Sequence, residues 1–319
     1  MKPNEPVLEE IMHGISKGYS SEKTWRRRIR MMMAETGLDF FCFSKILDAL
    51  SEKDIAEYSW QLRPENSAIF NKRIRELLAF RLTPKQELNQ MPCTGATLKK
   101  RVKRILEDMP LKDKKVLFLG DDDFTSVALA LTSDAEVHVV DIDPSILSGI
   151  QKASSKFGVK IHLHKHDLRE KLPESLRDKF DLFFTDPVYS IRGIKLFLLQ
   201  GLVALKSEGC RGYLCMPMVQ CMRMLRFIES FILQVGFEIV NIERSFNEYT
   251  VPSVAVSNLS QLCQKIRVFP KDLKDFTLSY SDLVSIRLNT EVYKRKSADK
   301  TISKIVKRDI IEFVDTRLT

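Results

Sequence analysis

The stretch that decides the fold runs from Val116 to Ala130 and reads Val-Leu-Phe-Leu-Gly-Asp-Asp-Asp-Phe-Thr-Ser-Val-Ala-Leu-Ala. Four consecutive apolar residues, Val116 to Leu119, predict a strand that is buried on both faces. Gly120 predicts the tight turn that ends this strand, and a helix is expected from Thr125 onward. A strand, a turn and a helix in this order form the first unit of a doubly wound nucleotide-binding sheet.

The turn itself is unusual because three aspartates, Asp121 to Asp123, follow the single Gly120. In dinucleotide-binding sheets this loop is rich in glycine, so that backbone N–H groups can approach an anionic group. Three carboxylates would instead repel a phosphate and attract an ammonium group, which predicts a cationic ligand or a metal. An aspartate can also serve only as a helix cap, and Asp123 is a candidate for that role. A cap explains one aspartate, however, and not three.

The composition is that of an ordinary globular chain. With 319 residues, of which 44% are hydrophobic, it can form two domains with normal cores. No run of about 18 apolar residues is present, and no apolar segment follows a basic start, so we expect a cytoplasmic protein without a membrane span. The six cysteines form no CxxC pair, which favours reduced thiols over disulfides or a zinc site. A net charge of +9 suggests a polyanionic partner, but the excess lysine and arginine lies mostly outside the acidic turn.

The chain divides into three predicted parts. Residues 1–83 show successive short helical patterns and are predicted as a helical, winged-helix-like domain. Its basic run from Arg26 to Arg30 can face a phosphate backbone, although a solvated helix face is favoured because no base-reading pattern is visible. Residues 84–288 are predicted as a Rossmann-like catalytic domain, entered through a linker at 84–92. Residues 289–319 are predicted as an exposed, basic C-terminal extension.

Two further patterns lie inside the predicted catalytic domain. The segment from Thr97 to Met109 predicts a basic amphipathic helix, with Leu98 and Ile105 facing inward and Arg101 facing outward among its charged neighbours. In the third predicted strand, residues 159–166, alternation places three histidines, His162, His164 and His166, on one face. Such a face can hold a metal, but ordinary hydrogen-bonded imidazoles are favoured because no cysteine or acid shares the spacing.

Acidic residues follow several of the predicted strands. Asp141 ends the second strand about 20 residues after the turn, where Rossmann-type folds hold ribose hydroxyls, while Asp143 is predicted as a helix cap. Asp167 follows the third strand, where an adenine amino group can be met. The stretch 180–189 is predicted as the fourth strand, which brings Asp186 and Tyr189 to the same edge. Because ligands bind at the carboxyl ends of such sheets, we expect these residues around one pocket with Gly120 to Asp123. Glu248 follows a later strand, where it can add one more acid.

Three stretches carry a family resemblance: Phe118–Ser126 with its Gly-Asp-Asp-Asp turn, Thr185–Pro187, and Gly193–Leu198. In these stretches the chain resembles the branched-chain polyamine synthase family, the N4-bis(aminopropyl)spermidine synthases. The resemblance implies transfer of aminopropyl groups from decarboxylated S-adenosylmethionine to the internal amine of spermidine, and it suggests a homodimer. It covers residues from about 84 to 270 and extends to an N-terminal helical or winged-helix domain.

The chemistry of the residues agrees with this resemblance. An acidic turn suits a sulfonium donor that lacks its carboxylate, and desolvated carboxylates would bind a polycationic acceptor. Attack requires a neutral amine, so one carboxylate must remove a proton, and Asp122 and Asp123 are the candidates for this catalytic base. Gly120, Asp121, Asp141 and Asp167 are then expected to bind the donor. Asp186, Tyr189 and Glu248 are expected to bind the polyamine, and no metal is required.

The chain departs from the family pattern at two points. It has Glu87-Leu88-Asn89-Gln90 where members of the family carry Glu-Leu-Asp-Gln or Tyr-Asp-Gln, and Asp186-Pro187-Val188-Tyr189 where they carry Asp-Pro-Pro followed by an acid. Two other functions stay open. The Asp-Pro-x-Tyr pattern and the basic flanks favour an S-adenosylmethionine-dependent methyltransferase acting on RNA. The basic helices alone favour a nucleic-acid-binding protein with an inactive catalytic domain.

Overall fold

The structure, a computed structural model, describes residues 67–85, 88, 90–216, 222–250, 279–289 and 295–306. The helices are α5 (Ser67–Leu78), α6 (Gly95–Asp108), α7 (Thr125–Ala130), α8 (Pro144–Phe157), η2 (Glu174–Leu176), α9 (Ile191–Ala204), α10 (Met222–Gln234) and α12 (Arg295–Val306). The strands are β1 (Lys115–Leu119), β2 (Glu136–Asp141), β3 (Ile161–Lys165), β4 (Leu182–Thr185), β5 (Arg211–Met216), β6 (Phe237–Tyr249) and β7 (Ser279–Leu288). Most of the predicted N-terminal domain, including the run from Arg26 to Arg30, lies outside the described residues.

The strands form one seven-stranded sheet in the order β3-β2-β1-β4-β5-β7-β6. Strands β3, β2, β1, β4 and β5 are parallel to one another, whereas β7 runs antiparallel to both β5 and β6. The order reverses between β1 and β4, which makes this the switch point where ligands bind in doubly wound sheets. The predicted α/β, Rossmann-like class is therefore confirmed. Strand β7 was not anticipated from the sequence.

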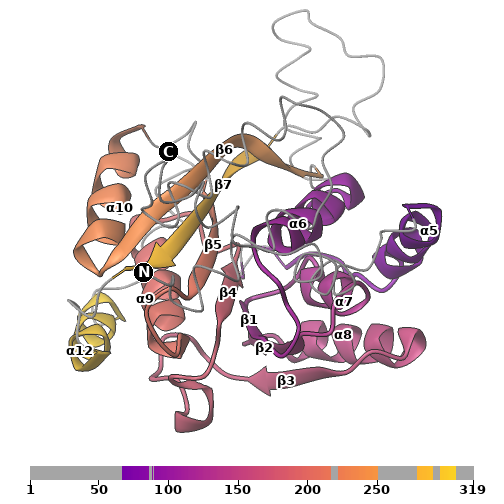
Figure 1. The fold of residues 1–319 in the computed structure, drawn as a ribbon, viewed down its shortest axis with the longest axis horizontal. Helices are drawn as coiled ribbons and strands as arrows, with labels where there is room; N and C mark the ends of the chain where they lie inside the picture. Colours follow the sequence, from indigo (N-terminus) through magenta and orange to yellow (C-terminus); the bar gives the residue numbers. More distant parts are fainter. Residues whose placement is uncertain are drawn as a thin grey trace, which may run out of the picture.

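Helices cover both faces of the sheet and give three layers (Figure 1). One core cluster joins α5, α6, α7 and α8 to one face of the sheet, and a second joins α9, α10 and α12 to the other. The apolar run of β1 explains this arrangement, because Val116 and Phe118 belong to the first cluster while Leu117 and Leu119 belong to the second. A strand buried on both faces in this way is typical of parallel sheets.

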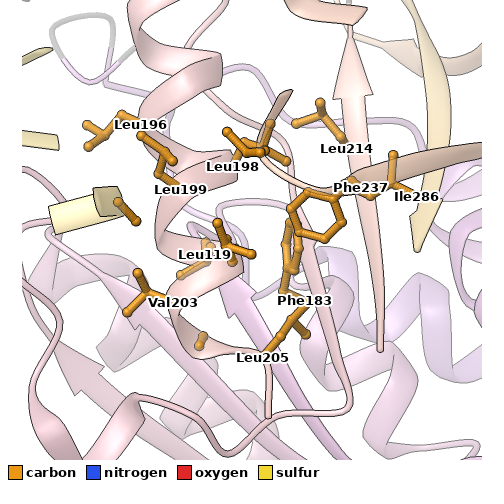
Figure 2. Packing of buried hydrophobic residues seen from close by; sticks show 14 of the residues in the cluster. Leu119, Phe183, Leu196, Leu198, Leu199, Val203, Leu205, Leu214, Phe237 and Ile286 are labelled. Carbon is orange, nitrogen blue, oxygen red and sulfur yellow. The ribbon is translucent and has the colours of Figure 1, made fainter. Parts of the chain in front are cut away.

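Phe183 of β4 packs among the buried hydrophobic residues on the α9 face of the sheet (Figure 2). A Cβ atom added at Gly201 of α9 would lie 2.6 Å from the Phe183 ring, and one added at Gly212 of β5 would lie 2.5 Å from it. The aromatic ring of β4 therefore fills the space that these two glycines leave open. This contact fixes α9 against the strand that leads to Asp186.

The C-terminal helix differs from the sequence-based expectation. Its described part, α12, packs against α9, and Ala298 and Ile302 are buried in the core cluster. Arg177 holds the helix from the other side through two hydrogen bonds of 3.0 Å to the Asp299 carboxylate. The expectation of an exposed appendage was wrong for this part, because the apolar residues of α12 recur at helical spacing and form a packing stripe.

The N-terminal end of the described chain also joins the core. Phe70, Ile74 and Leu77 of α5 are buried in the same cluster as α6 and α7, although the sequence analysis placed them in the N-terminal domain. The domain boundaries stay predictions. The three described cysteines, Cys93, Cys210 and Cys215, are free and buried, and none of the helices among the described residues is long and apolar enough to cross a membrane.

Candidate active site

The acidic turn begins where β1 ends, and the backbone holds its first aspartate. Gly120 has φ +71°, a conformation that suits glycine, and its N–H donates to the Val140 carbonyl at 2.8 Å. The Asp121 carboxylate accepts hydrogen bonds from the N–H groups of Thr125 (2.8 Å) and Ser126 (3.1 Å). Burial raises the pKa of Asp121 to about 8, even though both N–H groups favour the charged form. Phe124 occupies the N-cap position of α7, and Asp121, not Asp123 as suggested from the sequence, provides the carboxylate that accepts from the first N–H groups of this helix.

Asp123 is buried and fully engaged with the chain that precedes β1. Its carboxylate accepts a 2.5 Å hydrogen bond from the Cys93 N–H and forms an ion pair with Arg101. The Arg81 guanidinium donates to the Asp123 carbonyl oxygen at 2.5 and 3.0 Å. Burial alone would raise the pKa of Asp123, but the two guanidinium groups hold it below its usual value. Asp123 is therefore charged and poorly suited to accept a proton.

Arg101 is the centre of this arrangement. Its side chain is only 1% exposed, and its guanidinium reaches Asp123, Asp186 (2.5 Å), the Asn247 side-chain oxygen (2.8 Å) and the Tyr249 hydroxyl (3.2 Å). The prediction that this residue faces solvent was wrong. It lies three residues after Leu98 and four before Ile105, so it occupies the apolar face of α6, which packs on the sheet.

Asp186 lies at the carboxyl end of β4 and joins the acidic turn through Arg101. One of its carboxylate oxygens accepts from the Tyr189 hydroxyl at 2.9 Å, and the other accepts from the Tyr249 hydroxyl at 2.7 Å. Burial raises the pKa of Asp186, while Arg101 opposes that rise and Asp123 adds to it. The predicted residues Asp186 and Tyr189 are thus brought together, and Tyr249 joins them from β6.

Asp122 differs from both of its neighbours. Among the described residues its carboxyl group makes no hydrogen bond and no ion pair, and it lies partly exposed. Burial raises its pKa well above the usual value, and the nearby carboxyl groups of Asp123, Asp186, Asp121 and Asp141 raise it further. Its raised pKa and the absence of a described partner make Asp122 the carboxyl group of the turn that is best suited to accept a proton.

The end of β2 supplies two more carboxylates. Asp141 accepts from the N–H of Asp121 at 3.2 Å and from the N–H of Asp143 at 2.8 Å, which ties the tip of β2 to the acidic turn. Asp143 caps α8, as predicted, by accepting from the Ser145 N–H at 2.9 Å. It also forms a 2.8 Å ion pair with Lys85, so the predicted linker docks onto this edge of the sheet.

Two predicted residues lie apart from this group in their contacts. Asp167 forms an ion pair with Arg169 two residues later. The Glu248 carboxylate faces Lys100 at 3.7 Å, and its carbonyl accepts from the Thr94 N–H at 2.8 Å. Among the described residues, no hydrogen bond or ion pair joins the side chains of Asp167 and Glu248 to the acidic turn. Whether they bind a ligand stays a prediction.

The sequence indicated neither cation of the site, and it predicted Tyr249 only as an aromatic wall of the pocket. Arg81 and Arg101 precede the acidic turn, and Tyr249 follows Glu248 directly. The position of Arg101 on the apolar face of its helix was the available signal, since a charged residue there requires a partner. No comparable signal marks Arg81, because long-range folding alone brings it to Asp123, and the hydrogen bond from the Tyr249 hydroxyl to Asp186 likewise depends on long-range folding.

A seven-stranded sheet of this order, with acidic residues at its switch point, defines the class of protein to which the chain belongs. The fold is the Rossmann-like fold of S-adenosylmethionine-dependent methyltransferases and their relatives. The family model for the C-terminal domain of branched-chain polyamine synthase A matches residues 69–309. The chain therefore belongs to the branched-chain polyamine synthase family, as the resemblance indicated.

Individual relatives agree with this assignment. The chain is 40% identical over 141 residues to the N(4)-bis(aminopropyl)spermidine synthase of Thermus thermophilus, an alignment that covers 44% of this chain and 41% of the relative. It is 35% identical over 182 residues to the enzyme of the same name from Thermococcus kodakarensis, covering 56% of this chain and 52% of the relative. The chain thus spans about half the length of the curated relatives it matches.

Solved structures support the fold. The branched-chain polyamine synthase of T. thermophilus, in complex with N4-aminopropylspermidine and 5′-methylthioadenosine, is similar with a TM-score of 0.59 and 23% identity. The match covers 89% of this chain and 87% of that one. A candidate RNA methyltransferase from Pyrococcus horikoshii has a TM-score of 0.50 at 17% identity, covering 69% of this chain and 98% of that one.

Proposed function

We propose that this protein is an aminopropyltransferase that moves aminopropyl groups from decarboxylated S-adenosylmethionine to an amine of a polyamine such as spermidine. The observation that carries the proposal is Asp122, a carboxyl group that no described cation neutralises. It lies at the switch point of the sheet, among other carboxyl groups that raise its pKa. Membership of the polyamine synthase family supports the same reaction.

The charge balance of the site favours a cationic substrate. Six carboxyl groups face three cationic side chains; the acids are Asp121, Asp122, Asp123, Asp141, Asp143 and Asp186, and the cations are Arg81, Arg101 and Lys85. A bound ammonium group would favour the charged forms of Asp121 and Asp122, whose pKa values burial raises, whereas a bound carboxylate would raise those pKa values further. Decarboxylated S-adenosylmethionine has an ammonium group and no carboxylate, and a polyamine is a polycation, so both substrates suit this balance.

The proposed reaction needs one base and a correctly aligned pair of substrates. Asp122 removes a proton from the attacking ammonium group, which becomes a neutral amine. The amine nitrogen attacks the propyl carbon that is bonded to the sulfonium sulfur. A nitrogen–carbon bond forms while the carbon–sulfur bond breaks, and the electron pair of that bond remains on sulfur in 5′-methylthioadenosine. The rest of the rate comes from holding nitrogen, carbon and sulfur in line.

The other predicted site residues take binding roles in this proposal. Asp141 holds the ribose hydroxyls of the donor and Asp167 meets its adenine, as expected for the tips of β2 and β3. Asp186 and Tyr189 bind the polyamine, with Tyr249 as a further partner, because burial keeps both tyrosines neutral by raising their pKa. Asp123 helps to position Asp122 through its ion pair with Arg101. The two aspartates that were predicted to share the catalytic role therefore have different roles in this proposal.

Incubation of the protein with decarboxylated S-adenosylmethionine and a panel of polyamines tests the proposal. Mass spectrometry is expected to find products that have gained one or two aminopropyl groups, and fragmentation locates the nitrogen that received them. Release of 5′-methylthioadenosine in equal amount provides an independent readout. If no acceptor in the panel gains mass while the donor is stable, the proposal is wrong.

A comparison of donors separates this proposal from the two alternatives. We expect decarboxylated S-adenosylmethionine to raise the melting temperature more than S-adenosylmethionine does, because the carboxylate of the latter meets an acidic turn. The opposite order would favour a methyltransferase, for which Asp186-Pro187-Val188-Tyr189 is the supporting pattern. Salt-dependent binding of RNA or DNA without turnover would favour the third reading. A homodimer and a cytoplasmic location remain part of the proposal.

A further inference from the structure

Four titratable side chains gather on the α9 face of the sheet, where β2 and β3 run side by side. We call this group the histidine face; it consists of Glu136 and His138 of β2 and His162 and His164 of β3. Residues His138 and His162 are directly opposite each other in the parallel register. The His138 ring stacks on both β3 histidines, with centroid distances of 4.5 Å to His162 and 5.3 Å to His164.

The contacts of His138 resemble those of a metal ligand with an outer partner. One ring nitrogen, Nδ1, lies 3.0 Å from Nε2 of His164, and the other, Nε2, lies 2.8 Å from a carboxylate oxygen of Glu136. A histidine that binds a metal through one nitrogen commonly has its second nitrogen fixed by a neighbouring polar group. His164 is placed to provide that second contact.

Three of these residues offer donor atoms that can meet at one point. A carboxylate oxygen of Glu136 and ring nitrogens of His138 and His162 all lie within 4.8 Å of one another. Among the described residues, no hydrogen bond uses the ring nitrogens of His162, so this ligand is open. Two imidazole nitrogens and one carboxylate oxygen are a typical donor set for zinc, at bond lengths of about 2.0–2.2 Å.

We propose that the histidine face binds a divalent transition-metal ion of the zinc type, with Glu136, His138 and His162 as ligands and His164 as the partner that orients His138. The sequence analysis weighed a metal on the β3 histidines and did not favour it, because no acid shared their spacing. The acid comes from the adjacent strand instead. His166, the third histidine of the predicted face, is not one of the grouped ligands.

The charged and titratable groups around Glu136 are His138 and Lys115. Hydrogen bonds from His138 and Lys115 lower the pKa of Glu136 to about 2, so its carboxylate is charged at neutral pH. Burial lowers the pKa of His138, the hydrogen bond to Glu136 opposes this change, and the neighbouring histidines add to it. The one described cation on the carboxylate is Lys115, whose Nζ atom lies 3.0 Å from Glu136. Its side chain is 44% exposed and can turn into solvent when a metal enters.

This site is separate from the proposed active site. Glu136 is the first residue of β2 and Asp141 is the last, which places them about 16 Å apart at the usual rise of a strand. The metal would join the edge strand β3 to its neighbour β2. Its expected effect is therefore on the stability of the sheet edge, and the test does not depend on catalysis.

Binding of Co²⁺ and Zn²⁺ to the full chain, with any affinity tag removed, tests the proposal. We expect one equivalent of Co²⁺ to bind with absorption bands in the visible region, and Zn²⁺ to displace it and raise the melting temperature. The variants His162→Gln and Glu136→Gln each remove one ligand and should weaken binding at least tenfold. Their melting temperatures without metal show whether the sheet edge remains folded.

A lysine variant that should tighten metal binding, rather than weaken it, sharpens the test. Lys115→Ala removes the competing cation from Glu136 and should tighten Co²⁺ binding severalfold. The matched control is Lys152→Ala, which removes an exposed lysine from α8 on the other face of the sheet and should leave the affinity unchanged. Absence of one-equivalent binding in the unmodified chain, or equal affinity in His162→Gln, would overturn the proposal. An unchanged affinity in Lys115→Ala would contradict Glu136 as a ligand.

Discussion

The two sides of the acidic turn use the same residue type for opposite purposes. On the Arg101 side, Asp123 and Asp186 share one buried guanidinium and accept further hydrogen bonds from Cys93, Tyr189 and Tyr249, as the site geometry shows. On the other side, Asp122 has no such partner among the described residues, and its pKa is raised. A run of three identical residues therefore contains a cap, an ion-pair member and a free acid.

This difference shows how a fold can hold excess negative charge in one place. Buried charges are tolerated when they are paired and hydrogen-bonded, and an unpaired acid next to them takes up a proton instead. Arg101 stabilises two of the carboxylates, and their remaining field acts on Asp122. A cationic substrate would supply the missing positive charge. The predictions below test this separation of roles, beginning with the largest expected effect.

Replacing the free acid should abolish most of the activity and leave the fold intact. We expect Asp122→Asn to lower kcat/KM with decarboxylated donor and polyamine by about 10²- to 10⁴-fold, the usual contribution of a general base. Steady-state kinetics that follow 5′-methylthioadenosine release measure this effect. Undiminished turnover in a folded variant would remove Asp122 from the mechanism.

The same variant carries a stability signature of definite sign. Because the folded-state pKa of Asp122 is raised, its contribution to stability is full below the unfolded value of about 3.9 and is lost as pH rises through the folded value. Asparagine does not ionise, so the Asp122→Asn variant does not lose this stability as pH rises. The melting temperature of the variant should therefore exceed that of the unmodified chain at neutral and alkaline pH. The two melting temperatures should converge near pH 3. A variant that is less stable at every pH would show that Asp122 has a structural partner.

Removing the shared cation should have the largest effect on stability. Arg101→Met leaves Asp123 and Asp186 without their guanidinium in a buried setting, which costs about 3–5 kcal/mol for a broken buried pair. Urea unfolding followed by circular dichroism measures the change. If Arg101→Met does not fold, Arg101→Lys keeps the charge but not the fork of donors and should show a smaller loss. Equal stability of the methionine variant would contradict the central role of Arg101.

The sequence predicted which strands and acids form the site better than it predicted which partners those acids bind. The apolar runs of β1 and β4 and the acids at their ends follow from local pattern, because the carboxyl ends of parallel strands meet at one edge. Strand β7 escaped prediction because polar residues such as Ser281 and Asp282 are buried within it. Arg101 of α6 pairs with both Asp123 and Asp186, and Tyr249 of β6 donates to Asp186, but no local pattern indicates which acids receive Arg101.

Replacing the paired aspartate should reduce stability rather than act directly on chemistry. Asp123→Asn keeps the shape but weakens the bond to Arg101, and a loss of about 1–3 kcal/mol is expected. The folded-state pKa of Asp123 is lowered, so its stabilising effect is present above about pH 3.9 and disappears as pH falls through the folded value. The unfolding curves of Asp123→Asn and of the unmodified chain should therefore differ more at pH 7 than at pH 3. Full stability at pH 7 with complete loss of activity would return Asp123 to the catalytic role first predicted for it.

The smallest effect is expected at the edge of the site, where an aspartate is paired near solvent. Asp143→Asn retains a cap for the α8 N-terminus, because asparagine also accepts from the Ser145 N–H, but it loses the ion pair with Lys85. The Lys85 side chain is 40% exposed, and such a pair contributes at most about 1 kcal/mol. Lys85→Met should cost a similar amount, and the double variant should cost little more than either alone. Additive losses in urea unfolding would show that the two side chains act independently, and the docking of the linker onto this edge would then need another explanation.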